Sequence, residues 1–425
     1  MASWILFGAS CVLALFTINA FFPVRRNKVF FLPSFFASWL TIELAWWHLI
    51  WETAGLIVLV RLGALDRPIG WAGLAVFLLN WVALAYILLA GRGAGTAATA
   101  ALEALADEDH ASVHRGRVKR VRNVTYRRVA GRSIKLDVFM PAHPAEPGVK
   151  RPAVLQIHGG AWIIGDKREQ GIPLLKLLAS HGWVGFNANY RLSPGATWPD
   201  HLIDLKHAVA WIRAHADDYD VDPDFIAVTG GSAGGHLAAM MALTADDPAY
   251  QVGIEDADTS LQAAVPFYGV YDFTNRNNTM PDEFVARFLE PLVMKDFLSE
   301  NPGKFAAASP LDRITPDAPP FLVIHGDNDT LAPVEDAREF TRRLGDVSKS
   351  SAFYLELKGA QHAFDVFTSV RTRRVIRAVH RFLSVMHRRY LRGIPEDIAP
   401  AESEMVEGAV RVDEPADVER ATASG

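Results

Sequence analysis

The chain has 425 residues, of which half are apolar and 21% are charged, and its formal net charge is −5. This length allows a large core and an additional module, whereas so small a net charge does not indicate a nucleic-acid surface. Cys11 is the only cysteine, which excludes a disulfide framework and a thiolate metal site. The mean hydropathy of +0.10 is high for a soluble chain and predicts membrane segments.

The apolar excess is concentrated in residues 1–90, which we predict to be a transmembrane helical region. Residues 2–22 and 69–90 carry no charge, and each is long enough to cross a bilayer. Residues 29–65 between them are apolar but interrupted by charges. They fit one tilted span with an interfacial piece, or two short spans. We therefore predict three helices, with four as the alternative.

Four titratable residues interrupt this middle segment, namely Glu43, His48, Glu52 and Arg61. Charged groups are costly at membrane depth, which would indicate a ligand or lipid-headgroup role. Tryptophans are typical of the membrane–water interface, where charged neighbours are hydrated. Three of them lie in this segment, Trp46, Trp47 and Trp51. We favour the interfacial interpretation.

Basic residues predict the orientation of the chain in the membrane. Arg25, Arg26 and Lys28 follow the first span and favour a cytoplasmic first loop. With three helices, the rest of the chain also lies on the cytoplasmic side, whereas a fourth helix would reverse this. We predict a multi-pass protein of the cell membrane with its soluble part in the cytoplasm.

The remainder of the chain predicts one α/β domain between a linker and a tail. Residues 91–115 are rich in small and polar residues and are predicted to be the linker, leading into a short helix. Residues 116–391 form the predicted domain. Residues 392–425 are acidic and poor in aromatic residues, which is typical of a disordered tail.

Within the domain, short apolar segments alternate with helical patterns. A hairpin is predicted over 121–140, and strands over 153–157, 183–187, 225–229, 263–268, 321–325 and 352–357. Helices are predicted over 201–215, 233–244, 334–344 and 363–390. Buried strands that alternate with helices predict a mostly parallel sheet covered on both faces.

A glycine-rich stretch, VTGGSAGGHL, joins the strand at 225–229 to the helix that follows. A phosphate loop would need Lys-Ser/Thr after the glycines, and a dinucleotide fingerprint has a different glycine spacing. A linker would not be flanked by two apolar segments. GGSAG instead fits the G-x-S-x-G nucleophile elbow, in which glycines give steric clearance around an exposed Ser232. A turn without chemistry is the alternative.

A second loop, IHGGAWIIGD, follows the strand at 153–157. It resembles the HGG loop of lipases and esterases, whose backbone N–H groups bind a tetrahedral oxyanion. Gly159 and Gly160, with the amide of Ala233, are the expected donors. His158 is expected to brace the loop rather than transfer protons.

An acid and a histidine follow in the order that a nucleophile–acid–histidine triad needs. FLVIHGDNDTLAPV ends a strand in two candidate acids, Asp327 and Asp329. We favour Asp329, which lies further out on the loop, while Asp327 could hold the turn. His362 follows the last predicted strand, where a general base can reach back to Ser232.

Together these segments resemble the hormone-sensitive-lipase-like branch of α/β-hydrolases, with its carboxylesterases and its feruloyl-esterase and formamidase-like relatives. The matching text covers about residues 120–388 and comprises HGGAWIIGDK, NYRLSPGATWPDHLIDLKHAVAWI, VTGGSAGGHLAAM, SPLDRITPDAPPFLVIHGDNDTLAPV and GAQHAF. The whole chain resembles bacterial membrane-anchored carboxylesterases. Two departures are Ala161, where a third glycine is common, and Gly195, where many members have glutamate.

The resemblance implies an α/β-hydrolase fold and hydrolysis of carboxylic esters through an acyl-enzyme, without a metal or organic cofactor. Ser232 is the implied nucleophile, His362 the base and Asp329 its orienting acid. The implied partners are a small-molecule or lipid-like ester and, through residues 1–90, the bilayer, but no nucleic acid. The alternatives are an amidase or formamidase with the same triad, and a catalytically silent membrane receptor or scaffold.

One further segment has two interpretations. Residues 270–308 could form part of a cap over an acyl pocket, or they could be ordinary core helices. The candidate cap residues are Phe284, Phe288, Leu289, Leu292 and Phe297.

Overall fold

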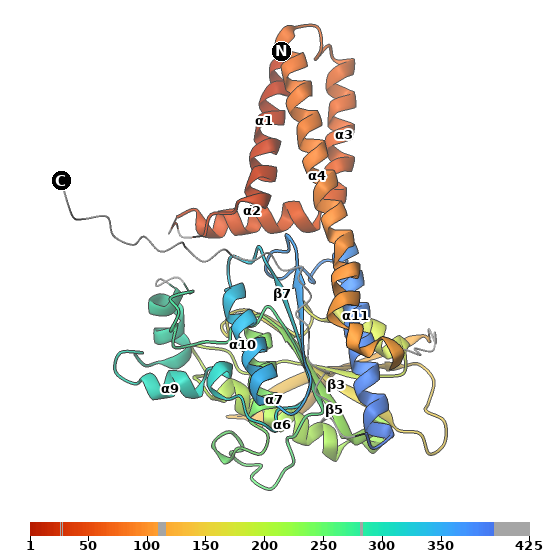
Figure 1. Ribbon diagram of the computed structural model, residues 1–425, viewed down its shortest axis with the longest axis vertical. Coiled ribbons are helices and arrows are strands. Elements are labelled where there is room, and N and C mark those ends of the chain that lie inside the picture. Colours follow the sequence, from red (N-terminus) through yellow and green to blue (C-terminus); the bar gives the residue numbers. More distant parts are fainter. Residues whose placement is uncertain (26, 28, 109–115, 281–283, 395–425) are drawn as a thin grey trace, which may run out of the picture.

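The computed structural model describes residues 1–425 except 26, 28, 109–115, 281–283 and 395–425. It consists of an apolar helical region that stands on an α/β domain (Figure 1). The helical region comprises α1 (Ala2–Phe21), α2 (Phe31–Glu43), α3 (Ala45–Arg61) and α4 (Pro68–Ala101). The predicted tail lies almost wholly outside the described residues.

The domain is built on one eight-stranded sheet of order β1-β2-β4-β3-β5-β6-β7-β8. The strands are β1 (Val118–Val129), β2 (Arg132–Pro141), β3 (Arg151–Ile157), β4 (Val184–Ala188), β5 (Val221–Gly231), β6 (Ala263–Phe267), β7 (Phe321–Gly326) and β8 (Ala352–Leu357). β1 and β2 form an antiparallel hairpin, β2 pairs antiparallel with β4, and the other pairs are parallel. The predicted mostly parallel sheet is confirmed.

Helices cover both faces of this sheet, as the alternating pattern predicted. The core on one face includes side chains of α6 (Asp200–Ala214), α7 (Ala233–Leu243) and α10 (Val334–Val347). The core on the other includes side chains of α5 (Ile172–Ser180), α11 (Val370–Leu391) and the end of α4. Short 3-10 helices lie at Glu103–Glu108, Asp217–Tyr219, Pro248–Tyr250 and Pro310–Asp312. The catalytic candidates are on loops at the carboxyl ends of the strands.

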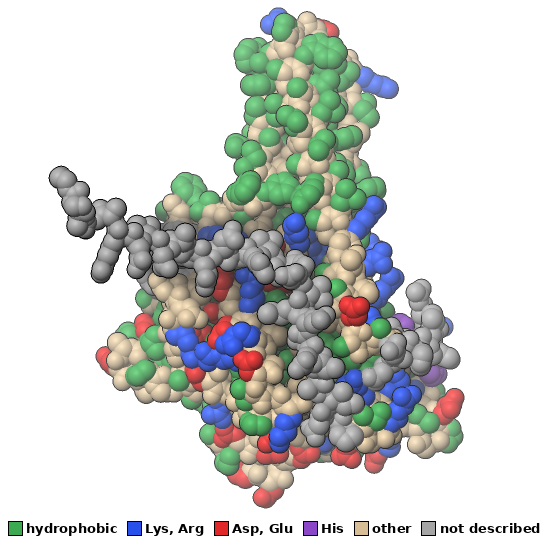
Figure 2. Space-filling view, in the orientation of Figure 1, with side chains coloured by type: hydrophobic (Ala, Val, Ile, Leu, Met, Phe, Trp, Pro, Cys, Tyr) green, Lys and Arg blue, Asp and Glu red, His purple; other side chains and the backbone are tan. Residues whose placement is uncertain are grey.

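Two helices, α1 and α4, are long and apolar enough to cross a membrane. α2 and α3 meet at an angle of 84° and could together supply a third span. α2 lies across the base of the other helices, next to the α/β domain (Figure 1). Apolar side chains cover the outside of the upper helices (Figure 2), among them the exposed Trp4, Phe16, Trp71 and Leu79.

Two acidic residues of the helical region, Glu43 and Glu52, are paired inside the protein. Glu43 forms a buried ion pair with Arg371 at the start of α11. Glu52 accepts a hydrogen bond of 2.9 Å from Asn80 of α4. Both carboxylates are buried, and protein side chains hydrogen-bond to them in place of water. The interfacial interpretation, which expected these two residues to be hydrated, is therefore wrong for Glu43 and Glu52.

The structure differs from the predicted linker, because α4 continues to Ala101. Gly91, Gly93 and Gly95 lower helix propensity in this stretch, but the helix is stabilised by packing. Ala94 and Ala98 are buried in the core that α11 shares. The small residues allow α4 to lie close to α11, and this tertiary contact outweighs local propensity.

The segment predicted as a cap or as core helices is mixed. It contains η4 (Val285–Met294), a π-helix, and α9 (Pro302–Ala307). Leu289 is fully buried in the core, whereas Phe288 and Phe297 are 43% and 53% exposed. The segment therefore has one face in the core, as ordinary core helices would, and apolar side chains on the surface; a cap over an acyl pocket stays a prediction.

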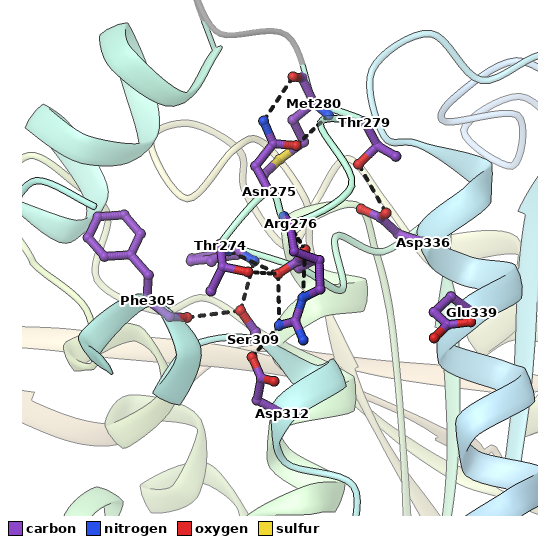
Figure 3. A network of polar contacts seen from close by, with 12 residues as sticks. Thr274, Asn275, Arg276, Thr279, Met280, Phe305, Ser309, Asp312, Asp336 and Glu339 are labelled. Carbon is purple, nitrogen blue, oxygen red and sulfur yellow. Dashed lines mark hydrogen bonds and ion pairs between the residues drawn. The ribbon is translucent and has the colours of Figure 1, made fainter. Parts of the chain in front are cut away.

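A polar network fixes the start of this segment to the domain (Figure 3). Asp272 accepts hydrogen bonds from the backbone N–H groups of Thr274 and Arg276. Ser309 Oγ accepts one from the Phe273 amide at 2.8 Å. Thr279 donates to Asp336 of α10 at 3.0 Å. The chain after β6 is therefore held close to α9 and α10.

Candidate active site

Ser232 lies on the sharp turn between β5 and α7. Its backbone has φ 59° and ψ −122°, which is strained for a residue with a side chain. Its amide donates to the Phe267 carbonyl at 3.0 Å, which ties the turn to the end of β6. The side chain is partly exposed. This geometry is that of a nucleophile elbow.

The glycines around Ser232 provide steric clearance, as the sequence predicted. A Cβ on Gly230 would lie 2.4 Å from the Gly234 carbonyl oxygen. A Cβ on Gly234 would lie 2.2 Å from the Ile157 carbonyl oxygen. Both contacts are with backbone atoms that cannot rotate away. The elbow can therefore pack against β3 only with glycine at these positions.

Asp329 and His362 are brought into direct contact from the loops after β7 and β8. Asp329 Oδ2 accepts a hydrogen bond from His362 Nδ1 at 2.7 Å. Asp329 Oδ1 accepts from the amides of Leu331 and Ala332 at 2.8 and 2.9 Å. Asp329 is only 2% exposed, so its hydrogen bond with the imidazole is shielded from water.

A second histidine, His325 on β7, also contacts Asp329 at 3.2 Å. Burial by itself raises the pKa of Asp329, but the His362 and His325 imidazoles outweigh it and hold this pKa well below its usual range. Asp329 is therefore charged at neutral pH. His325 was not among the predicted site residues, although the strand-end segment IHGDND places it four residues before Asp329.

Asp327, the other candidate acid, has a different partner. Its Oδ1 accepts a hydrogen bond from the Gly359 amide at 2.6 Å, and its own amide donates to Leu357. Asp327 therefore joins the loops after β7 and β8, as the alternative for this residue predicted.

Tyr268 lies between the serine turn and the histidine. Its ring centroid is 4.6 Å from that of His362. A Cβ on Gly231 would lie 2.6 Å from the Tyr268 hydroxyl oxygen. Within the described residues, no hydrogen bond joins the Ser232 hydroxyl to His362. Such bonds are often loose without substrate. The serine turn and His362 therefore both lie against the Tyr268 side chain.

The predicted oxyanion donors do not have equal roles. The Gly159 amide donates to Gln170 Oε1 at 2.7 Å, so that this N–H is already used to hold the loop. The amides of Gly160 and Ala233 have no acceptor among the described residues. A Cβ on Gly159 would lie 3.0 Å from Ser232 Cβ, which places the HGG loop directly against the serine.

Two other histidines near the elbow are structural. His158 is buried, stacks on Tyr190 at 4.5 Å and donates through Nδ1 to the Gly159 carbonyl at 2.8 Å. Burial lowers its pKa. His236 on α7 bonds to Ala308, and burial lowers its pKa to about 3. Both side chains are therefore neutral and brace their surroundings.

A cavity of about 1240 Å³ lies at the β1–β2 edge, away from these groups. Ser232, Asp329 and His362 do not line it. Two of its cations, Arg120 and Lys167, pair with Asp137 at 2.6 and 2.8 Å and brace this edge. Within the part of the chain that the structure describes, no cluster of three or more His, Cys, Asp or Glu side chains is arranged to hold a metal ion.

Comparison with known proteins identifies the family. The BD-FAE family model matches residues 136–344. The chain is 40% identical to the probable carboxylic ester hydrolase LipM of Mycobacterium tuberculosis over 401 residues, which are 89% of this chain and 92% of LipM. It is 47% identical to esterase LipQ of the same organism over 259 residues, 61% of each chain.

A solved structure shares the fold. The butyrate-bound esterase Est2 of Thermogutta terrifontis superimposes with a TM-score of 0.52 at 25% identity, over 68% of this chain and 96% of that one. Because the match to LipM covers 89% of this chain, it includes at least part of the helical region as well as the α/β domain. The chain belongs to the hormone-sensitive-lipase-like α/β-hydrolases, a family of carboxylic ester hydrolases, as the sequence motifs predicted.

Proposed function

We propose that this protein is a membrane-anchored serine carboxylesterase that uses Ser232, His362 and Asp329 and forms an acyl-enzyme. The observation that carries the proposal is the buried Asp329–His362 contact of 2.7 Å beside a serine on a strained, glycine-flanked turn. An acid that fixes one nitrogen of an imidazole leaves the other free to accept a proton from a nucleophile. The esterase names of the relatives support the same reaction class.

In the proposed first step, Ser232 Oγ attacks the ester carbonyl carbon while His362 Nε2 takes the hydroxyl proton. Asp329 stabilises the imidazolium through Nδ1. The carbonyl oxygen becomes an oxyanion, which the amides of Gly160 and Ala233 bind at the N-terminus of α7. Gly159 supports the loop through Gln170 in place of the direct role expected from the sequence.

Collapse of this intermediate breaks the C–O bond, and the leaving alcohol takes the proton from His362. The acyl group is then bonded to Ser232. Water attacks the acyl-enzyme with His362 again as the base, and the acid leaves as Ser232 regains its proton. Atoms balance with the ester and water alone, so the scheme uses no metal or organic cofactor.

We further propose that residues 1–90 hold the enzyme in the cell membrane as a multi-pass region. The lengths of α1 and α4 and their exposed apolar side chains support this. Arg25 bonds to the α/β domain, so the loop that carries it lies on the domain side of the helices. Basic loops favour the cytoplasm, and we therefore assign the domain to that side.

The test of the proposed function is active-site labelling of the full-length protein in detergent. A fluorophosphonate probe should label Ser232, and Ser232→Ala should abolish both labelling and hydrolysis of short-chain p-nitrophenyl esters. Matched ester and anilide substrates then separate an esterase from an amidase. If no probe is incorporated and no ester is hydrolysed, the protein is better described as a silent receptor or scaffold.

A further inference from the structure

The helical region contacts the two loops that carry Asp329 and His362. The guanidinium group of Arg25, in the loop before α2, donates to the backbone carbonyl of Asp329 at 2.9 Å and to Asn328 Oδ1 at 3.2 Å. On α2, Trp39 Nε1 donates to the carbonyl of Ala363, the residue after His362, at 3.0 Å. α2 lies directly over this end of the sheet (Figure 1).

An aromatic side chain of α2 also packs against the catalytic imidazole. Phe35 is 5% exposed, and its ring lies edge-on to His362 with 6.5 Å between centroids. Tyr268 contacts the same imidazole at 4.6 Å. The position of the His362 ring therefore depends on one aromatic residue from the domain and one from the helical region.

Gln361 links α2 to both catalytic loops at once. Its Oε1 accepts hydrogen bonds from the Thr330 amide at 2.8 Å and from the His362 amide at 2.9 Å. Its Nε2 donates to Ser38 of α2 at 3.4 Å, a long contact. A shift of α2 would therefore reach the residues next to Asp329 and His362 through one buried side chain.

The helical region is fixed to the domain on both sides of α2. Before α2, Asn328 donates to the Ala20 carbonyl near the end of α1. At the last residue of α2, Glu43 forms its buried ion pair with Arg371. Both residues are buried, and separating a buried ion pair leaves an uncompensated charge at a large cost in free energy. The ion pair therefore stabilises the docked position of α2.

We propose that the docked α2 and Arg25 before it are a working part of the active site, in which Arg25 positions Asp329 and Phe35 positions His362. This inference rests on the proposed function, since it needs Asp329 and His362 to act in hydrolysis. The opposite side of α2 exposes Leu32, Phe36 and Leu40, which would lie against lipid. The rate of hydrolysis therefore depends on how α2 is docked against the catalytic loops, and the helical region is more than a membrane anchor.

The test compares Arg25→Ala with Arg61→Ala in the full-length protein. Arg61 ends α3 and is an exposed arginine of the same helical region. Active sites are counted by end-point phosphonate labelling, and rates per labelled site are measured with p-nitrophenyl butyrate. A small displacement of catalytic groups costs up to about 100-fold in rate. We therefore expect Arg25→Ala to lower kcat about 10- to 100-fold with little change in KM, and Arg61→Ala to change neither.

Two further variants separate positioning from a folding effect. Arg25→Lys keeps one cationic donor and should recover part of the lost kcat. Phe35→Ala should lower kcat per labelled site, whereas Phe30→Ala, which shortens an exposed phenylalanine at the start of the same helix, should not. Thermal unfolding of each variant reports on folding independently.

The outcomes distinguish this inference from the proposed function. If Ser232 is labelled in the unmodified enzyme but Arg25→Ala and Phe35→Ala turn over as fast per site as their controls, the helical region is only an anchor and the inference is overturned. Equal rates for Arg25→Lys and Arg25→Ala would also contradict a positioning role for the charge. If Ser232 is not labelled in the unmodified enzyme, the proposed function itself fails.

Discussion

Replacement of Asp329 by asparagine should nearly abolish hydrolysis without unfolding the protein. The carboxylate accepts hydrogen bonds from His362 and two backbone amides, and His325 contacts it at 3.2 Å. An asparagine can keep its oxygen toward the two amides, and it then presents an NH₂ group to His362. Because the NH₂ group is a donor, His362 Nδ1 must be unprotonated and accept its hydrogen bond, and the imidazole proton then lies on Nε2. A protonated Nε2 cannot accept the hydroxyl proton of Ser232.

The wrong tautomer lowers kcat by about 10⁴ in triads of this kind, which corresponds to about 5 kcal/mol of transition-state stabilisation. The assay is kcat per folded protein for p-nitrophenyl butyrate, with near-ultraviolet circular dichroism to confirm folding. Asp327→Asn is the matched control, because its oxygen can still accept the Gly359 bond. It should retain activity within about 10-fold. An Asp329→Asn enzyme with a tenth of the original kcat, or an equal loss in Asp327→Asn, would refute the assignment.

Two predictions concern stability. Burial raises the pKa of Asp336 to about 7, so the folded state holds a proton that the unfolded chain releases near pH 4. The contribution of Asp336 to the free energy of unfolding therefore falls as pH rises from 4 to 7. At pH 8, Asp336→Asn should be more stable than the unmodified protein by at most about 4 kcal/mol. Parallel pH profiles of thermal unfolding for the variant and the unmodified protein would contradict this. Gly234→Ala should destabilise by about 3 kcal/mol or more because its Cβ would meet the Ile157 carbonyl. Gly303→Ala, with open space around it, should not; equal melting temperatures of the two variants would count against the steric argument.

The sequence was sufficient to predict the sheet and the catalytic candidates because both depend on local signals. Short apolar segments between turn residues placed every strand within a few residues. The serine turn and the HGG loop were recognised because sterics demand glycine where β5 and α7 approach β3. α11 begins at Val370 rather than at 363, because the loop after His362 ends at Ser369, whose side chain caps the helix by accepting from the Thr372 amide.

Contacts between distant parts of the chain could not be predicted from local sequence patterns. Asp327 and Asp329 both end a strand, and only their partners, Gly359 and His362, distinguish them. The continuation of α4 through glycine-containing sequence depends on α11, which lies nearly 300 residues later. The contact of α2 with His362 is of the same kind, because an apolar helix shows no pattern that tells a lipid-facing side from a side that packs on a catalytic loop.

In the proposed mechanism, Ser232 carries the acyl group during turnover. The most direct measurement is peptide mass spectrometry of the full-length enzyme, acid-quenched within milliseconds of mixing with p-nitrophenyl butyrate. We predict a butyryl group on the peptide that contains Ser232, formed together with a burst of p-nitrophenol of one equivalent per site. Steady hydrolysis without any acylated Ser232 and without a burst, or undiminished hydrolysis by Ser232→Ala, would contradict the mechanism.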